Sequence, residues 1–213
     1  MSQKKKKYNT DTCWYDKKTT PKQMILGAQG VLFPILEHSD HFSILKTLVS
    51  HIPKMSSIVE LGCGAAEFSR VFPEYFYIGA DLPHIVNAVS RAVNPSNTYI
   101  TFDIYKDNID FVEEYDVVLM NAFIDVLEKP LECFEKVLMM SRKIILHRQL
   151  FSEYKSTSIK LNPSYGGTTY QSIINFIEFE NMLDIYHFKI EQHIKHNENM
   201  DFGDWKGSML LCK

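Results

Sequence analysis

The sequence has few cysteines, no long apolar run and no excess of one charge. Its 213 residues include four cysteines and carry a formal net charge of −3. The cysteines are far apart, which excludes a disulfide framework and a cysteine-rich metal site: Cys13, Cys63, Cys133 and Cys212. No apolar run approaches bilayer length. A nearly balanced charge gives no long-range attraction to nucleic acid or to an anionic membrane. We therefore expect a cytoplasmic protein with neither kind of partner.

The N-terminus also lacks the apolar segment that a secretory signal requires. Four consecutive lysines (4–7) are followed by polar residues, so we expect residues 1–20 to form a flexible tail. Residues 21–52 have apolar positions at helical spacing, interrupted near Pro34, which predicts a helical cap. No linker or repeat divides the rest. The sequence predicts a single domain with a core over residues 53–213.

Five short apolar runs follow the cap and alternate with segments of helical length. The runs are 56–62, 77–82, 98–104, 115–121 and 142–148. The helical segments are 65–72, 83–93 and 130–141. Such alternation is typical of βαβ units, in which a parallel sheet is covered by helices on both faces.

The C-terminal region departs from this alternation. Residues 176–184 read as a helix, whereas 186–194 and 206–213 read as strands. The connection between these strands is too short for a helical crossover, so they should form an antiparallel hairpin. The fold class expected is α/β, with a Rossmann-like, seven-stranded, mostly parallel sheet whose last strand is antiparallel.

A glycine turn follows the first strand, in the stretch VELGCGAAEFSR (59–70). A triphosphate-binding loop needs a lysine and a serine or threonine after its second glycine, and Gly64 is followed by alanines instead. A dinucleotide fingerprint needs a small third residue where this chain has Glu67, whose charge would repel a pyrophosphate. The remaining candidate is a cofactor that contains adenosine but no phosphate.

Polar residues end the next three strands, on the carboxyl edge where open α/β sheets bind ligands. Asp81 lies nineteen residues after Gly62, the spacing of a carboxylate that binds ribose hydroxyls. Asp103 ends the third strand and Asn121 the fourth. The alternatives are that Asp81 only caps the next helix and that Asp103 is only a turn residue.

Together, VELGCG, IGADLP, TFDI and YDVVLMNAFIDVLEKP resemble the S-adenosylmethionine-dependent methyltransferases with a Rossmann-like fold, over residues 56–148. The resemblance implies S-adenosyl-L-methionine as cofactor and S-adenosyl-L-homocysteine as product. It also implies a set of cofactor-binding residues: Glu60, Gly62, Cys63, Gly64, Asp81, Leu82, Asp103, Ile104, Asn121 and Ala122. In this set Asp81 would bind the ribose, Asp103 with Ile104 would frame the adenine, and Asn121 with Ala122 would cover the methionine. Cys63 is not expected to be a nucleophile, because no nearby cation lowers its pKa.

Methyl transfer to an alcohol requires a general base near the acceptor. His147, at the carboxyl end of the fifth predicted strand, is the candidate base, and Arg148 is a candidate clamp for an anionic group. The alternative is a structural histidine beside a buried ion pair. Residues 154–170 read as a substrate loop, with Tyr165 and Tyr170 as candidate acceptor contacts; the alternative is an ordinary mobile loop.

No metal is expected, because neither histidine pair, His38 with His41 or His193 with His196, has a third ligand nearby. HRQLF and PSYGGTTY are similar to small bacterial methyltransferases of surface-polysaccharide biosynthesis. That similarity implies O-methylation of a sugar, such as a nucleotide-linked sugar for capsule synthesis. N-methylation of a small amine and a non-catalytic cofactor-binding partner protein stay open. Either a monomer or a homodimer is compatible with the sequence.

Overall fold

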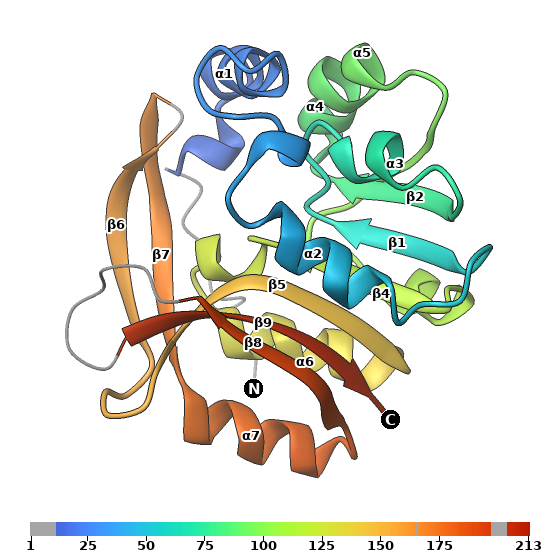
Figure 1. Cartoon of the computed structure of the whole chain (residues 1–213). Helices are drawn as coiled ribbons and strands as arrows, with labels where there is room; N and C mark the ends of the chain where they lie inside the picture. The colour runs from blue at the N-terminus through green and yellow to red at the C-terminus, as the bar shows by residue number, and fades with distance from the viewer. Residues whose placement is uncertain (1–11, 165, 197–203) are drawn as a thin grey trace, which may run out of the picture.

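The computed structural model describes residues 12–164, 166–196 and 204–213. In these ranges nine strands join into one sheet (Figure 1). The strands are β1 Ser57–Leu61, β2 Phe76–Asp81, β3 Thr98–Thr101, β4 Val117–Asn121, β5 Lys143–Ser152, β6 Ser158–Ser164, β7 Gly167–Asn175, β8 Lys189–His196 and β9 Asp204–Cys212. The first five are parallel and lie in the order β3-β2-β1-β4-β5. Strand β9 runs antiparallel between β5 and β8. The mostly parallel Rossmann-like sheet with an antiparallel last strand is therefore confirmed.

Two of the nine strands lie in the segment that we expected to be a loop. Strands β6 and β7 form an antiparallel hairpin over Ser158–Asn175. Near its end β7 pairs in parallel with Phe151 and Ser152 of β5, beyond the last paired residue of β4. Strand β6 is an edge strand, and its side chains are exposed or half-buried, so polar residues are suited to it. Its composition therefore resembles that of a loop, which is why the sequence did not indicate a strand here.

Helices cover both faces of the sheet (Figure 1). The α-helices are α1 Thr19–Ala28, α2 Phe42–Val49, α3 Glu67–Val71, α4 Pro83–Ile85, α5 Arg91–Val93, α6 Pro130–Met140 and α7 Phe176–Ile185. Shorter turns of other helix types are η1 Cys13–Tyr15, η2 Leu36–His38, η3 Val86–Ser90, η4 Asp110–Glu114 and η5 Ile124–Val126. Leu45 and Leu48 of α2 share a buried cluster with Phe68 of α3, whereas Phe134 of α6 and Phe179 of α7 belong to the opposite cluster. None of the helices in the described residues has the length and apolar character needed to cross a membrane.

Residues 12–20, which we expected in a flexible tail, are instead packed against the domain. Cys13 is buried in η1 and Thr20 is buried in the first turn of α1. The Thr20 hydroxyl donates a hydrogen bond to the Cys13 carbonyl at 2.7 Å. Residues 1–11 lie outside the described residues. Because residues 12–20 have hydrophobic and hydrogen-bonded partners far away in the chain, their polar sequence does not reveal this packing.

Candidate functional site

A cavity of about 260 Å³ lies at the carboxyl edge of β1–β5. Pockets that enclose a small-molecule ligand usually measure roughly 300 Å³ or more, so this one is just below the usual range. Its wall includes most of the residues that the sequence indicated: Gly62, Gly64, Asp81, Leu82, Asp103, Ile104, Asn121, Ala122, Arg148 and Tyr170. These residues are spread over about a hundred positions of the chain. They come from the ends of β1, β2, β3 and β4 and from within β5 and β7, and the topology of the sheet brings them to one cavity.

The turn after β1 is left-handed at both of its glycines. Gly62 has a φ of 71° and Gly64 a φ of 51°, values that glycine adopts without strain. A Cβ atom on Gly62 would also collide with the Phe123 ring. Ala66, with a φ of 55°, is a third left-handed residue in the same turn, which the sequence did not single out. The turn is thus restricted to very small residues for reasons of backbone shape as well as space.

The carboxylate of Asp81 is fixed by the backbone around it. Its Oδ2 accepts a hydrogen bond from the Gly64 N–H at 2.8 Å, and its Oδ1 accepts one from the Leu82 N–H at 2.7 Å. Burial raises the pKa of Asp81 to about 6, and these two hydrogen bonds oppose that rise. No side-chain cap forms at the start of α4, so the helix-cap alternative does not describe Asp81. Asp81 lines the cavity, and the two hydrogen bonds fix the orientation of its carboxylate.

Asp103 both closes a turn and lines the cavity. Its carboxylate accepts hydrogen bonds from the Tyr105 N–H at 3.1 Å and from the Tyr15 hydroxyl at 3.2 Å, and it forms an ion pair with Lys106. Tyr15 and Trp14 come from η1 and line the cavity as well. Trp14 Nε1 donates a hydrogen bond to Thr169 Oγ1 of β7. Sequence reasoning missed both aromatic residues because it assigned them to a tail.

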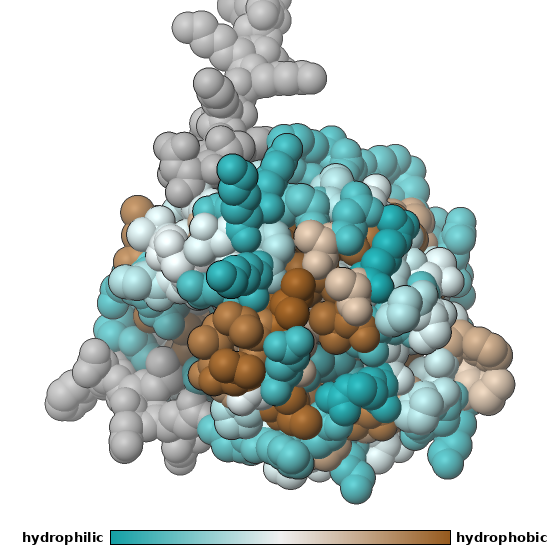
Figure 2. All heavy atoms as spheres, turned by 90° about the horizontal axis from the view of Figure 1, so that it is seen from above, coloured by the Kyte–Doolittle hydropathy of each residue, from teal (hydrophilic) through white to brown (hydrophobic). Residues whose placement is uncertain are grey.

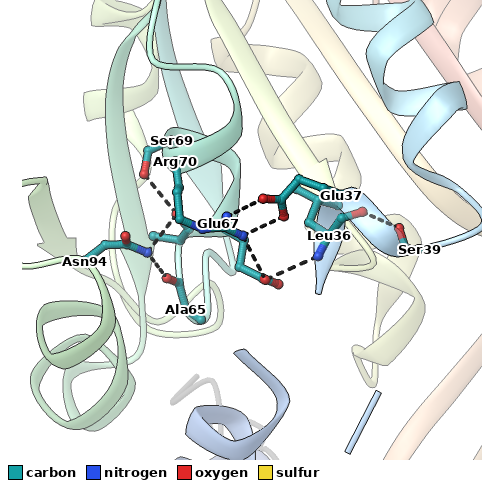
Figure 3. Close-up of polar contacts among 9 residues, drawn as sticks. Leu36, Glu37, Ser39, Ala65, Glu67, Ser69, Arg70 and Asn94 are labelled. Carbon is teal, nitrogen blue, oxygen red and sulfur yellow. Dashed lines mark hydrogen bonds and ion pairs between the residues drawn. The ribbon is translucent and has the colours of Figure 1, made fainter. Parts of the chain in front are cut away.

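Glu67 also lines the cavity, where it is held by protein partners (Figure 3). Its Oε1 accepts the Leu36 N–H at 3.3 Å, and its carboxylate lies 3.6 Å from the Arg70 guanidinium. Arg70 in turn pairs with Glu37. Burial raises the pKa of Glu67. These contacts join the glycine turn to the segment that precedes α2, and Glu67 thereby closes one side of the cavity.

Two residues of the predicted cofactor-binding set do not line the cavity. The Glu60 carboxylate is buried and accepts a hydrogen bond from the Tyr77 hydroxyl, and burial raises its pKa to about 8. The Cys63 thiol is buried 3.7 Å from the Ser90 hydroxyl, with a pKa that burial raises well above its ordinary value. Both side chains are buried inside the domain, where Tyr77 and Ser90 are their partners, although the residues belong to the strand and turn that lead to the carboxyl edge of the sheet. Neither residue lines the cavity, and their place in the cofactor-binding set stays a prediction.

His147, the candidate base, does not line the cavity either. It is fully buried, and both ring nitrogens have partners within the protein: Nε2 lies 3.1 Å from His41 Nδ1, and Nδ1 lies 2.8 Å from Ser208 Oγ. Burial holds its pKa well below the usual range. Because β5 continues to Ser152, His147 lies inside the strand instead of at its end. The position of His147 matches the structural-histidine alternative.

Near the ends of β4 and β5, Asn121 in the cavity wall and Asp125, which does not line the cavity, each have a polar atom without a partner in the described part of the chain. Among the described residues, Asn121 Oδ1 and Asp125 Oδ1 are buried and accept no hydrogen bond. Asp125 follows Asn121 closely in the chain, and burial raises its pKa to about 6. Tyr170 of β7 lines the same cavity, whereas Tyr165 lies outside the described residues. No group of three or more potential metal ligands occurs within the described ranges.

Comparisons with known proteins identify the fold. The N-terminal domain of EvdMO1, crystallised in the presence of S-adenosylhomocysteine (SAH) and D-fucose, has a TM-score of 0.62 and 12% identity, with 84% of this chain and 85% of that domain covered. The chain has the fold of class I S-adenosylmethionine (SAM)-dependent methyltransferases. A methyltransferase from Mesorhizobium loti has a TM-score of 0.61 and 16% identity, over 84% of this chain and all of that one. Magnesium protoporphyrin IX methyltransferase from Synechocystis PCC 6803, with bound SAM, has a TM-score of 0.55 and 15% identity, over 80% and 76%. No family model and no curated protein matches the sequence.

Proposed function

We propose that the protein is an enzyme that binds S-adenosylmethionine and transfers its methyl group to a small molecule. The observation that carries this proposal is the fixed carboxylate of Asp81, which lies beside the glycine turn and lines the cavity at the edge of this fold. A carboxylate whose oxygens are both oriented by backbone N–H groups is a preorganised acceptor for two vicinal hydroxyls, such as those of a ribose.

The charges of the wall fit an adenosyl cofactor better than a phosphorylated one. Three of its side chains are carboxylates, Asp81, Asp103 and Glu67, and Arg148 is the only lysine or arginine among the lining residues of the described chain. A pyrophosphate placed at the glycine turn would lie beside Asp81 and Glu67, and no lysine or arginine of the described lining near the turn would bind it. S-adenosylmethionine carries a sulfonium and an ammonium group, which such a wall favours. The residues present therefore fit this cofactor.

In this proposal each part of the wall has one task. Asp81 orients the ribose, and Asp103 with Ile104 holds the adenine. When bound, the cofactor supplies an electrophilic methyl group on sulfur. The protein contributes mainly orientation and exclusion of water, because in-line transfer depends on how the acceptor atom is placed. Trp14 and Tyr15 cover the cavity and exclude water from it.

For the acceptor, we propose a sugar as the first candidate. The resemblance of HRQLF and PSYGGTTY to methyltransferases of polysaccharide biosynthesis supports it, as does the EvdMO1 domain studied with D-fucose. A second candidate is a small amine. It is favoured by the position of His147, since no histidine lines the cavity within the described residues and an uncharged amine needs no general base. The fold likeness to an N1-methyltransferase of didemethyltoxoflavin agrees with that candidate.

The test begins with binding and continues with turnover. Isothermal titration calorimetry of the full chain with SAM and with SAH should give binding of one molecule per chain. A panel of matched sugars, nucleotide-linked sugars and amines is then screened for release of SAH. Absence of binding for both SAM and SAH would refute the proposal, whereas tight binding without turnover of any acceptor would favour a non-catalytic partner protein.

A further inference from the structure

Arg148 lies on a β-bulge whose backbone is held in an unusual shape. In the pairing of β5 with β9 the register shifts between Leu146 and Gln149, so that His147 and Arg148 both lie opposite Ser208. Arg148 has a φ of 66°, in the left-handed region that a residue with a side chain rarely adopts. Bulges redirect side chains, and strained backbone in a cavity wall points to a functional constraint. The bulge places His147 in the interior and Arg148 at the cavity.

The Ser208 hydroxyl holds this bulge with all of its hydrogen-bonding capacity. Its oxygen accepts the Arg148 N–H at 3.2 Å and lies 2.8 Å from His147 Nδ1 and 2.7 Å from His196 Nε2. One ring nitrogen must donate to the hydroxyl and the other must accept from it, because a hydroxyl has one proton and two lone pairs. His41 extends the chain of hydrogen bonds to the segment before α2. Ser208 and His147 are both fully buried, so these bonds do not compete with water.

The Arg148 guanidinium has no hydrogen bond or ion pair with any other described residue, although it lines the cavity. Burial raises the pKa of Asp125, and the positive charge of Arg148 opposes that rise. Next to it, Asn121 has a buried oxygen without a partner, and Ala122 is a second left-handed residue, with a φ of 50°. Guanidinium groups in a cavity wall favour bidentate contacts with carboxylate or phosphate. The Arg148 guanidinium is therefore the group of this wall that can bind an anion, whereas the Asn121 oxygen can accept a hydrogen bond from a hydroxyl or N–H group of the same ligand.

Arg148 lies across the sheet from the residues proposed to bind the adenosine part of the cofactor. We therefore infer that the anion it binds belongs to the methyl acceptor. Asp103, Asp81 and the glycine turn follow β3, β2 and β1, whereas Arg148 lies on β5, on the other side of β4. Phe33, in the loop after α1, lines the cavity and is still 42% exposed, so part of the cavity wall is apolar and reaches the surface. Figure 2 shows hydrophobic residues gathered at the centre of the face seen from above.

We propose that Arg148 binds a carboxylate or phosphate group of the methyl acceptor, and that Ser208 is the positioning residue that keeps the bulge, and so the guanidinium, in place. This inference rests on the proposed function and names the class of its acceptor: a small anionic molecule.

Inorganic phosphate and acetate serve as probes for the site. Each is titrated into the full-length protein, with and without saturating SAH, at constant ionic strength, and the apparent dissociation constant is taken from the rise in Tm. Phosphate should stabilise the SAH-loaded wild type, and Arg148→Gln should weaken phosphate binding at least tenfold. Arg148→Lys should lie between them, because a single ammonium cannot form the bidentate contact. Arg91→Gln, which changes an exposed arginine bonded to Asn87, is the matched control and should behave as the wild type.

The anion bound by Arg148 could belong to the acceptor or could be the carboxylate of the cofactor. The affinity for SAH, measured by calorimetry on the same variants, separates these two sources. Arg148→Gln should change it by less than about twofold. A tenfold loss would place Arg148 on the carboxylate of the cofactor and overturn the proposal, as would phosphate binding that is absent in the wild type or unchanged in Arg148→Gln. If SAH does not bind the wild type at all, the proposed function fails instead.

Ser208→Ala tests the positioning role. It should weaken phosphate binding by about threefold to tenfold and leave SAH affinity unchanged, whereas a merely structural role would lower both together. The Tm of each variant without ligand shows whether it folds. If Ser208→Ala does not fold, the Arg148 variants decide the anion site and the positioning role is withdrawn.

Discussion

The two halves of the cavity are built differently. In the half formed by the turns after β1, β2 and β3, the polar groups already have protein partners: Asp81 accepts two backbone N–H groups, and Asp103 accepts from Tyr15 and Tyr105. In the half formed by β4, β5 and β7, Asn121 has an orphaned oxygen and Arg148 has no partner for its guanidinium among the described residues. The first half is preorganised, whereas the second leaves its polar groups without protein partners.

This difference follows from what each half has to recognise under the proposed function. A cofactor is the same molecule in every turnover, and a site whose dipoles are already oriented binds it without reorganisation. An acceptor supplies the missing partners itself, and a buried polar group left unpaired by a wrong acceptor then gives selectivity. The predictions below test whether the two halves can be disturbed separately, in order of decreasing effect.

The largest effect is expected from Asp81→Asn. The amide keeps the shape of the side chain but loses the charge that strengthens two hydrogen bonds to the ribose, each worth roughly 1.5–3 kcal/mol. We expect SAH affinity to fall about a hundredfold or more, measured by calorimetry. Asp184→Asn, at an exposed position of α7, is the control and should bind as the wild type. A change below threefold in Asp81→Asn would mean that Asp81 does not contact the cofactor.

His147→Ala should mainly lower stability. It removes the nearer of two partners of His41 Nδ1 and one partner of the Ser208 hydroxyl, and it opens a space in a fully buried position. We expect the free energy of unfolding to fall by about 2–4 kcal/mol in urea titrations. His51→Ala, at an exposed position, should have no measurable effect. Unchanged stability, with turnover lost once an acceptor is known, would restore His147 as the base.

The affinity for SAH should depend on pH through Asp81. Burial raises its pKa to about 6, and the ionised form is the one that accepts two ribose hydroxyls. Binding therefore favours loss of the proton, so affinity is full above about pH 7 and falls as the pH drops through 6, by up to about tenfold per pH unit. Calorimetry between pH 5 and 8 measures this slope. In Asp81→Asn, affinity should be low but flat over that range; a wild-type slope retained in the variant would assign the titration to another group.

The smallest effect is expected at Glu67. Glu67→Ala leaves the buried Leu36 N–H without its acceptor and should lower the free energy of unfolding by about 1 kcal/mol. Glu67→Gln retains an acceptor at that position and should cost less than half as much, which makes it the matched control. Equal losses in the two variants would show that the charge, through Arg70, matters more than the hydrogen bond to Leu36.

The half of the cavity formed by the turns after β1, β2 and β3 could be predicted from the sequence because its parts follow one another in adjacent βα units. A glycine turn directly follows an apolar strand and Asp81 ends the next strand, so both reach the cavity through their own βα units, which the hydrogen bond from the Gly64 N–H to Asp81 joins. Glu60 and Cys63 belong to the same local motif, yet their side chains turn inward. A motif thus predicts the path of the backbone better than the direction of each side chain.

The chain's alternation of strands and helices determined the parallel sheet, and the residues after β1, β2 and β3 determined which groups line its edge. Only the tertiary structure decided the other half. Whether His147 or Arg148 faces the cavity depends on a bulge held by Ser208, sixty residues away from Arg148. Likewise Tyr15 reaches Asp103 because η1 packs across the edge, 88 residues away in sequence. Hydrogen bonds between distant segments leave no periodic pattern in the sequence, because each depends on one pair of atoms that folding brings together.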